Sequence, residues 1–205
     1  MPEKKRTRSE IKREAIIEAA RTAFQQDGVQ ATSMDKLAEL AQVSKRTVYN
    51  HFATKEELVM FLLTDLWNSA LVNVEPQYNA EIALENQLSA LLRDEIELVS
   101  SKDYIELSRV AFGHFFYHPE ALKKEVEKFA PQETALFKWL EAASEDKRLV
   151  EFDIGFGFEQ LHNLIKGSCF WPQIMKFEET LDKAAKDRLA EHSAKMFLGM
   201  YEKRV

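Results

Sequence analysis

Residues 44–51 gather, on one short segment, side chains that can hydrogen-bond to nucleic acid. Arg, Asn and Thr can read base edges in the major groove of B-DNA, and Lys or Tyr can bind phosphates. An α-helix fits into that groove, so we interpret the segment as a DNA-recognition helix. The side chains expected to face the groove are Lys45, Arg46, Thr47 and Asn50, and Ser44 lies on the same outward face.

The residues before this segment predict a partner helix. Thr32-Ser33-Met34-Asp35 fits an acidic capping box and indicates a helix through Ala41, and Ser44 can cap the next one after a break at Gln42-Val43. Two short helices can cross at a steep angle only if the side chains at their contact are small, and Ala38 and Ala41 provide such side chains. The pattern is therefore a helix-turn-helix. The side chains expected to flank the groove are Thr32, Ser33, Tyr49, His51 and Lys55.

The first helix is expected to begin at a Ser9 cap and to end at Asp27-Gly28. Residues 1–8 lack apolar periodicity and form a basic arm. Its four cations, Lys4, Lys5, Arg6 and Arg8, leave two interpretations open: a solubilising tail, or contact with phosphates or the minor groove.

Charge is distributed unevenly along the chain. Residues 1–56 hold 11 Lys and Arg against 8 Asp and Glu, a balance of +3, whereas the whole chain carries −6, so residues 57–205 carry −9. A basic head on an acidic body is typical of a protein that touches a polyanion with one end only. We therefore expect a DNA-binding domain over 1–54 and a separate domain over 55–205.

The second domain is expected to be helical like the first. Only 6 glycines and 5 prolines are present, too few for the turns of a sandwich or barrel. Helical apolar spacing recurs over 81–100, 103–117, 131–143, 153–170 and 178–204, with Pro172 expected to end the fourth of these. The fold class is all-α, with about nine helices by this periodicity.

The last two long helices carry apolar stripes that indicate an intersubunit four-helix bundle in a homodimer. The stripe of the earlier helix comprises Ile154, Phe158, Leu161 and Ile165. That of the final helix comprises Leu181, Ala185, Leu189, His192, Met196 and Met200, with Phe197 and Tyr201 beside it.

The aromatic residues of the second domain are either ordinary core or the lining of a ligand pocket, since helix bundles bind apolar ligands between their helices. The lining residues we expect to converge are Trp67, Phe112, Phe116, Phe158 and His162. His114 and His118 have metal-ligand spacing, but Phe115 stands where a zinc hydrolase has Glu, so we expect no metal and no cofactor.

Three absences bound the location and the chemistry. The single cysteine, Cys169, cannot form an intramolecular disulfide, and we expect it to be a buried thiol in a reducing compartment. No apolar run approaches the roughly 18–20 residues that span a bilayer, so we expect a cytoplasmic protein. Paired carboxylates with a positioned histidine, a glycine-rich phosphate loop and a nucleophile motif are all missing from the sequence, which argues against an enzyme.

About 50 residues of the N-terminal part resemble the TetR family of transcriptional regulators. The resemblance lies in Ile17–Phe24, Gly28, Thr32-Ser33, Leu37-Ala38, Ala41, Val43-Ser44, Val48-Tyr49, His51-Phe52, Lys55-Glu56 and Leu58. Gln42 departs from the pattern, which usually has glycine in the turn. The helix order around Trp171-Pro172 is similar to that of an AefR-like C-terminal domain.

The resemblance implies that Tyr49, His51 and Lys55 grip phosphates while Arg46 and Thr47 approach bases. It also implies a homodimer on a near-palindromic double-stranded operator. The function predicted is a repressor released by a hydrophobic or amphipathic small-molecule effector. The alternative is an activator or a protein-partner-dependent regulator of the same fold, without a small-molecule ligand.

Overall fold

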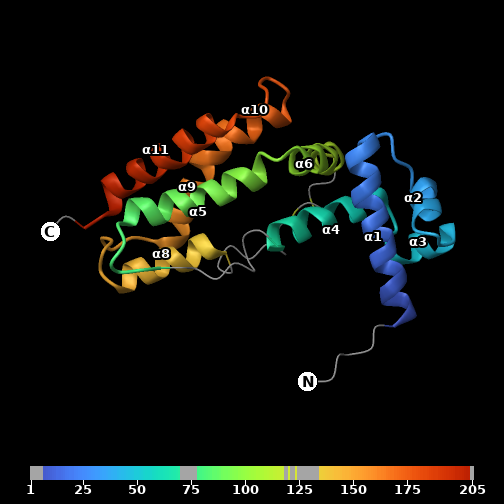
Figure 1. Cartoon of the computed structure of the whole chain (residues 1–205), viewed down its shortest axis with the longest axis horizontal. Helices are drawn as coiled ribbons and strands as arrows, with labels where there is room; N and C mark the ends of the chain where they lie inside the picture. Colours follow the sequence, from blue (N-terminus) through green and yellow to red (C-terminus); the bar gives the residue numbers. More distant parts are fainter. Residues whose placement is uncertain (1–6, 70–77, 118–119, 121–122, 124–133, 204–205) are drawn as a thin grey trace. The chain divides into compact units, whose positions relative to one another are not determined.

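A computed structural model describes residues 7–69, 78–117, 120, 123 and 134–203 (Figure 1). Over these residues the chain forms ten helices and no strand, which confirms the all-α prediction. The helices are α1 (Arg8–Asp27), α2 (Met34–Leu40), α3 (Lys45–His51), α4 (Lys55–Trp67), α5 (Leu84–Val99), α6 (Lys102–Phe115), α8 (Ala135–Glu145), α9 (Ile154–Cys169), α10 (Trp171–Ile174) and α11 (Lys183–Tyr201).

The chain divides into two compact units. One comprises Met1–Thr64 with Glu106–Glu125, and the other Asp65–Ile105 with Val126–Val205. The start of α4 belongs to the first unit, where Phe61 of α4 packs on Phe52 and Arg13, and the domain boundary after residue 54 stays a prediction. The Phe61 ring lies 5.7 Å from the Phe52 ring, and the Arg13 guanidinium stacks on both, 4.2 and 5.0 Å from their centroids.

Short polar side chains begin the N-terminal helices. Thr7 caps α1 and forms a capping box with Glu10, so α1 begins before the expected Ser9 cap. Ser33 caps α2, and Ser44 caps α3 as predicted. Each cap satisfies a backbone N–H that the helix itself leaves without a carbonyl partner.

In the second unit α5 is the central helix and packs against α8, α9 and α11. Figure 1 shows α5 and α11 side by side. The stripe Leu88, Leu92, Ile96 and Val99 of α5 is fully buried. Trp139 of α8 is also fully buried, and its Nε1 donates a hydrogen bond to Gln87 Oε1 at 3.1 Å. That bond satisfies the one polar atom that the indole brings into the core.

The C-terminal helices differ in detail from the expectations. Helix α9 ends at Cys169, one residue before the expected end at residue 170, and Pro172 lies in the first turn of the short helix α10, where its missing N–H costs no hydrogen bond. The expected intersubunit stripes also include side chains buried within this chain. These are Phe158, Leu161, Ile165, Phe197 and Tyr201, which pack in the interior that α5 organises.

The turn between α2 and α3 is tight. Gln42 adopts φ 54°, the left-handed conformation that favours glycine. Val43 N–H donates to Ala38 O at 3.0 Å, which closes the turn. Ala38 and Ala41 are buried at the crossing, and Val48 of α3 is fully buried beneath it. Small side chains here let the two helices approach closely, as the sequence predicts.

Replacing Gln42 by glycine should stabilise the chain. A side chain in the left-handed region costs about 1–2 kcal/mol, partly offset by the greater freedom of glycine in the unfolded state. We expect Gln42→Gly to raise the free energy of unfolding by about 0.5 kcal/mol in urea denaturation. The control is Gln26→Gly in the last turn of α1, which should not raise it, because glycine is a poorer helix former than glutamine. Equal losses in both variants would contradict the strain argument.

Candidate DNA interface

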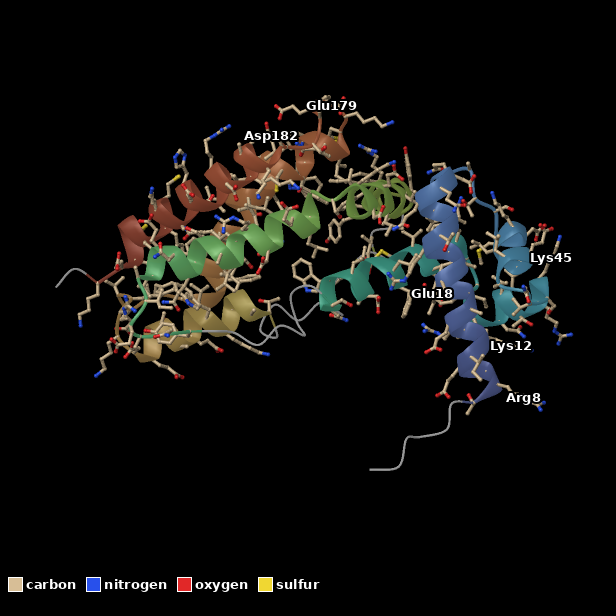
Figure 2. The ribbon with its side chains drawn as sticks, viewed as in Figure 1. Arg8, Lys12, Glu18, Lys45, Glu179 and Asp182 are labelled. Atoms are coloured by element: carbon tan, nitrogen blue, oxygen red, sulfur yellow. The ribbon has the colours of Figure 1, made fainter. Side chains whose placement is uncertain are left out.

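Helix α3 presents an exposed polar face. Lys45, Arg46, Tyr49 and Asn50 are exposed, while the intervening Val48 is fully buried and anchors the helix. Thr47 and His51 are half-buried at its edges. Arg8 and Lys12 of α1 are also exposed, and Figure 2 shows these two side chains and Lys45 extending away from the ribbon. The face predicted to read DNA is therefore accessible.

Two hydroxyls order the first turn of α3. Ser44 Oγ accepts a hydrogen bond from Thr47 N–H at 3.2 Å and lies 2.8 Å from Thr47 Oγ1. Since the two hydroxyls bond to each other, the Thr47 side chain has a defined position beside Arg46. Ser44 contributes to the face by fixing where the helix begins.

Lys45 forms an ion pair across the motif. Its Nζ lies 2.5 Å from Asp35 Oδ2 of α2, and both side chains are at least half exposed. The hydrogen bond and charge of Asp35 raise the pKa of Lys45, so the ammonium is fully charged at neutral pH. At this exposure the pair adds little stability, but it holds the lysine at the start of the recognition face.

Two predicted flanking residues donate hydrogen bonds to backbone carbonyls of the loop before α2. Thr32 is 1% exposed, and its hydroxyl donates to Gly28 O at 2.9 Å, so this side chain joins α1 to α2 and does not face DNA. Lys55 is half-buried, and its Nζ donates to Val29 O at 3.0 Å and Thr32 O at 3.3 Å. The structure thus corrects the expectation that the Thr32 side chain flanks the groove. The Lys55 side chain holds the loop before α2 through its bonds to two backbone carbonyls.

Comparisons with known proteins identify this motif. Residues 16–60 match the model of bacterial regulatory proteins, tetR family, and residues 86–203 match the AefR-like transcriptional repressor, C-terminal domain. The second match alone covers more than half of the chain. The chain belongs to the TetR family. The first match contains every side chain predicted to contact DNA, and the second confirms the expected AefR-like domain.

Individual TetR-family proteins agree with this assignment. A regulator from Pseudomonas syringae pv. tomato has a crystal structure that is 36% identical, covering 94% of this chain and 97% of its own, with a TM-score of 0.73. The Flavonoid-responsive Regulator FrrA is 25% identical, covering 95% and 98%, with a TM-score of 0.67. The regulator TtgR of Pseudomonas putida is 45% identical over 64 residues, which is 30% of each chain. The chain thus matches less than a third of that curated relative's length.

The family assignment settles the broad function. This TetR-family chain is a transcriptional regulator that binds DNA and is not an enzyme. Within the described part of the chain, no helix has the length and apolar character to cross a membrane. Of the basic arm, Arg8 is the first residue of α1, and Lys4, Lys5 and Arg6 lie outside the described residues.

The five predicted ligand residues separate into two groups. His162 of α9 contacts Trp67 and Phe158, with ring centroids 5.7 Å apart in each case. Phe112 of α6 pairs with Phe116, which directly follows this helix, with ring centroids 5.8 Å apart, and both belong to the other compact unit. Trp67, Phe158 and His162 thus meet within one unit. The convergence of all five residues stays a prediction.

Sequence reasoning missed Glu95 of α5, a buried acid that contacts His162. Its signal was present, since Glu95 continues the apolar stripe of Leu88 and Leu92 at helical spacing. Among the described residues, no group of three His, Cys, Asp or Glu side chains could hold a metal ion. The side chains of His114 and His118 lie outside the described part.

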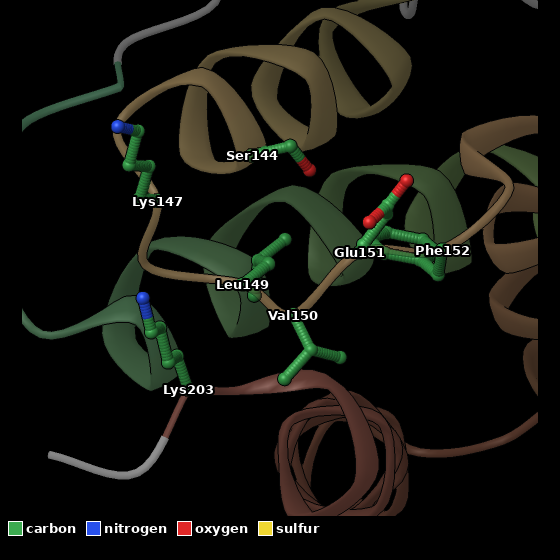
Figure 3. A pocket seen from close by; sticks show the side chains of 7 residues that line it. All are labelled: Ser144, Lys147, Leu149, Val150, Glu151, Phe152 and Lys203. Atoms are coloured by element: carbon green, nitrogen blue, oxygen red, sulfur yellow. The ribbon is translucent and has the colours of Figure 1, made fainter.

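An open groove of about 490 Å³ lies on the second unit, where α8 leads into α9 (Figure 3). The Ser144 hydroxyl, which is buried and has no hydrogen-bond partner among the described residues, is on one side of it. None of the five predicted ligand residues contributes to the groove. Its lining is Ser144, Lys147, Leu149, Val150, Glu151, Phe152 and Lys203.

The corrected position of Thr32 makes a testable distinction. Thr32→Val removes the buried hydroxyl and leaves the Gly28 carbonyl without its donor, so we expect the free energy of unfolding to fall by about 1 kcal/mol. DNA affinity should stay within about twofold at a temperature where the variant is folded, since no DNA contact is lost. Thermal unfolding and a DNA-binding titration measure the two effects. A large loss of affinity with unchanged stability would restore Thr32 as a DNA contact.

Proposed function

We propose that the chain is a homodimeric repressor that binds a near-palindromic operator and is released by a hydrophobic or amphipathic effector. The observation that carries the proposal is the exposed polar face of α3 in a TetR-family helix-turn-helix. The repressor role is supported by the AefR-like repressor model that residues 86–203 match.

The side chains of α3 divide by the contacts their chemistry allows. Arg46 and Asn50 are exposed and can bond to purine edges through two atoms each, and Thr47 lies beside them. Tyr49 and His51 flank this row and can donate to phosphates, as can Ser33 at the start of α2. Arg46, Thr47 and Asn50 therefore carry the sequence preference, while the flanking residues contribute affinity.

The homodimer is supported by apolar side chains left exposed on two helices that pack together, α9 and α11. Phe156 of α9 is 55% exposed, and Met196 and Met200 of α11 are 65% and 70% exposed, with His192 one turn before them. Exposed apolar residues at helical spacing mark an association face. A two-fold dimer would present two α3 helices to successive major grooves about 34 Å apart.

The effector is supported by the aromatic group around His162. Trp67, Phe158 and His162 meet in the second unit, which residues of the AefR-like match mostly form. Trp67 is the last residue of α4, a helix whose first residues pack on the head. A ligand releases the operator only if it binds the non-operator conformation more tightly. The relative FrrA is named a flavonoid-responsive regulator, and flavonoids are aromatic molecules.

Selection of bound sequences from a random duplex pool tests the operator proposal. We expect the wild type to enrich a palindrome and Arg46→Ala to lose preference at one base position per half-site, a loss of about 1–3 kcal/mol in discrimination. Tyr49→Ala should weaken binding to all sequences alike. The control is Arg188→Ala, an arginine of α11 far along the chain from the recognition helix. The proposal is wrong if the folded wild type enriches no sequence.

Charged residues on the exposed face of α11 should separate the dimer. In Met196→Glu/Met200→Glu, four carboxylates would meet across a two-fold interface, so we expect a monomer by sedimentation. Operator affinity should fall at least about tenfold, because one head alone makes half of the contacts. Ile82→Glu introduces one carboxylate per subunit at another exposed apolar residue and should remain dimeric. A dimer that survives the double substitution would place the interface elsewhere.

A further inference from the structure

One face of helix α9 carries a column of polar residues near the buried carboxylate of Glu95. His162, Lys166 and Cys169 follow each other at spacings of four and three residues, which places them on one face. Glu95 of α5 is 2% exposed and hydrogen-bonds through Oε1 to His162 Nδ1. A buried carboxylate costs several kcal/mol unless it is paired, and an apolar residue would stabilise such a core at least as well. Glu95 is therefore tolerated in the core because His162 pairs with it.

The bond to Glu95 decides what His162 offers to a ligand. A carboxylate accepts a hydrogen bond from Nδ1–H, which leaves Nε2 of the neutral ring as a lone-pair acceptor. Within the described residues, this is the only hydrogen bond of the imidazole, and 18% of the His162 side chain is exposed. An imidazole fixed at one nitrogen and partly accessible is prepared to accept a hydrogen bond from a ligand.

The surroundings of His162 are aromatic. The Phe158 ring stacks on the imidazole at 5.7 Å with an interplanar angle of 16°, and Trp67 meets it edge-on at 78°. Phe137 extends the row, 5.8 Å from Phe158. Flat rings in stacked and edge-on arrangements favour a planar aromatic ligand over a flexible aliphatic chain.

Lys166 and Cys169 complete the chemistry of the column. The Lys166 ammonium lies 5.0 Å from the Phe170 centroid and 5.8 Å from that of Trp67. Burial lowers the pKa of Lys166, and the Glu95 charge opposes this shift. Burial and Glu95 raise the pKa of Cys169 to about 12, so it remains a neutral thiol. The column thus places the Lys166 nitrogen one helical turn from the His162 imidazole.

We infer that His162, positioned by Glu95, is the polar anchor of the effector site and that the effector is a planar aromatic molecule bearing a phenolic hydroxyl. The hydroxyl donates to His162 Nε2, while Lys166 can donate to another oxygen of the same molecule. The inference rests on the proposed function, because it assumes that an effector binds the second unit. It adds the chemical class of that effector and assigns Glu95 as a positioning residue.

A matched pair of probes tests the hydroxyl requirement. The full-length protein is titrated by calorimetry with apigenin, a hydroxylated flavone, and with flavone, its unsubstituted parent. One hydrogen bond is worth about tenfold in affinity, so we expect the wild type to bind apigenin at least about tenfold more tightly. His162→Leu should abolish this preference. Asn163→Leu, which makes a similar polar-to-apolar change at the neighbouring exposed residue of α9, should keep it.

The role of Glu95 needs a readout that a loss of stability alone would not change. We expect the imidazole nitrogen shifts in the NMR spectrum to show His162 in the Nδ1–H form in the wild type. Glu95→Leu should move it toward the Nε2–H form and remove the preference for apigenin. If Glu95→Leu does not fold, Glu95→Gln is measured in the same way, and it should weaken the tautomer preference because a neutral amide is a poorer acceptor.

Three outcomes overturn the inference. These are equal affinities of the wild type for the two probes, an apigenin preference that survives in His162→Leu, and no binding of either probe. Each leaves the operator proposal intact if the same preparation enriches a palindrome in the duplex selection. Loss of that enrichment, with the apigenin preference retained, would instead overturn the repressor function and keep the ligand site.

Discussion

The close crossing of α2 and α3 is the constraint on which the DNA interface depends. Ala38 and Ala41 have no side-chain atoms beyond Cβ, so the two short helices can approach closely, and Val48 fills the space between them. A larger residue at either alanine would push α3 outward and rotate its exposed face. Val48 lies on the buried side of α3, and Arg46 and Asn50 lie on its exposed side. Fixing Val48 in the interior therefore also fixes Arg46 and Asn50 on the outside.

Much of the first unit could be predicted because its signals are local. Ser44 begins α3 where a capping residue was expected, and Gln42 takes the left-handed turn where the family usually has glycine. A cap or a turn depends on residues within four positions, and that information is in the sequence. The recognition face could be predicted in the same way, because Val48 is the one buried residue of α3 and the polar residues on either side of it are exposed or half-buried.

Residue type does not show which partner a side chain meets. Thr32 and Lys55 have side chains that suit phosphate binding, and in the structure both donate to backbone carbonyls of the loop before α2. Trp67 of α4 meets His162 of α9, a contact between residues far apart in the chain that no pattern along the sequence shows. Residue type gives the chemistry that a side chain can perform, whereas the partner it meets depends on tertiary packing.

Glu95 shows where sequence periodicity holds information that residue type conceals. An acid is usually assigned to the surface, but the spacing of Leu88, Leu92 and Val99 places this one on the buried stripe of α5. Such a position is stable only if another element supplies a donor, and His162 of α9 does so. The carboxylate and the imidazole therefore constrain each other, since removing either would leave a buried polar group without its partner. Because the Glu95–His162 pair is costly to break, it fixes the relative position of α5 and α9. It is also a polar contact at a defined place in the interior of the second unit.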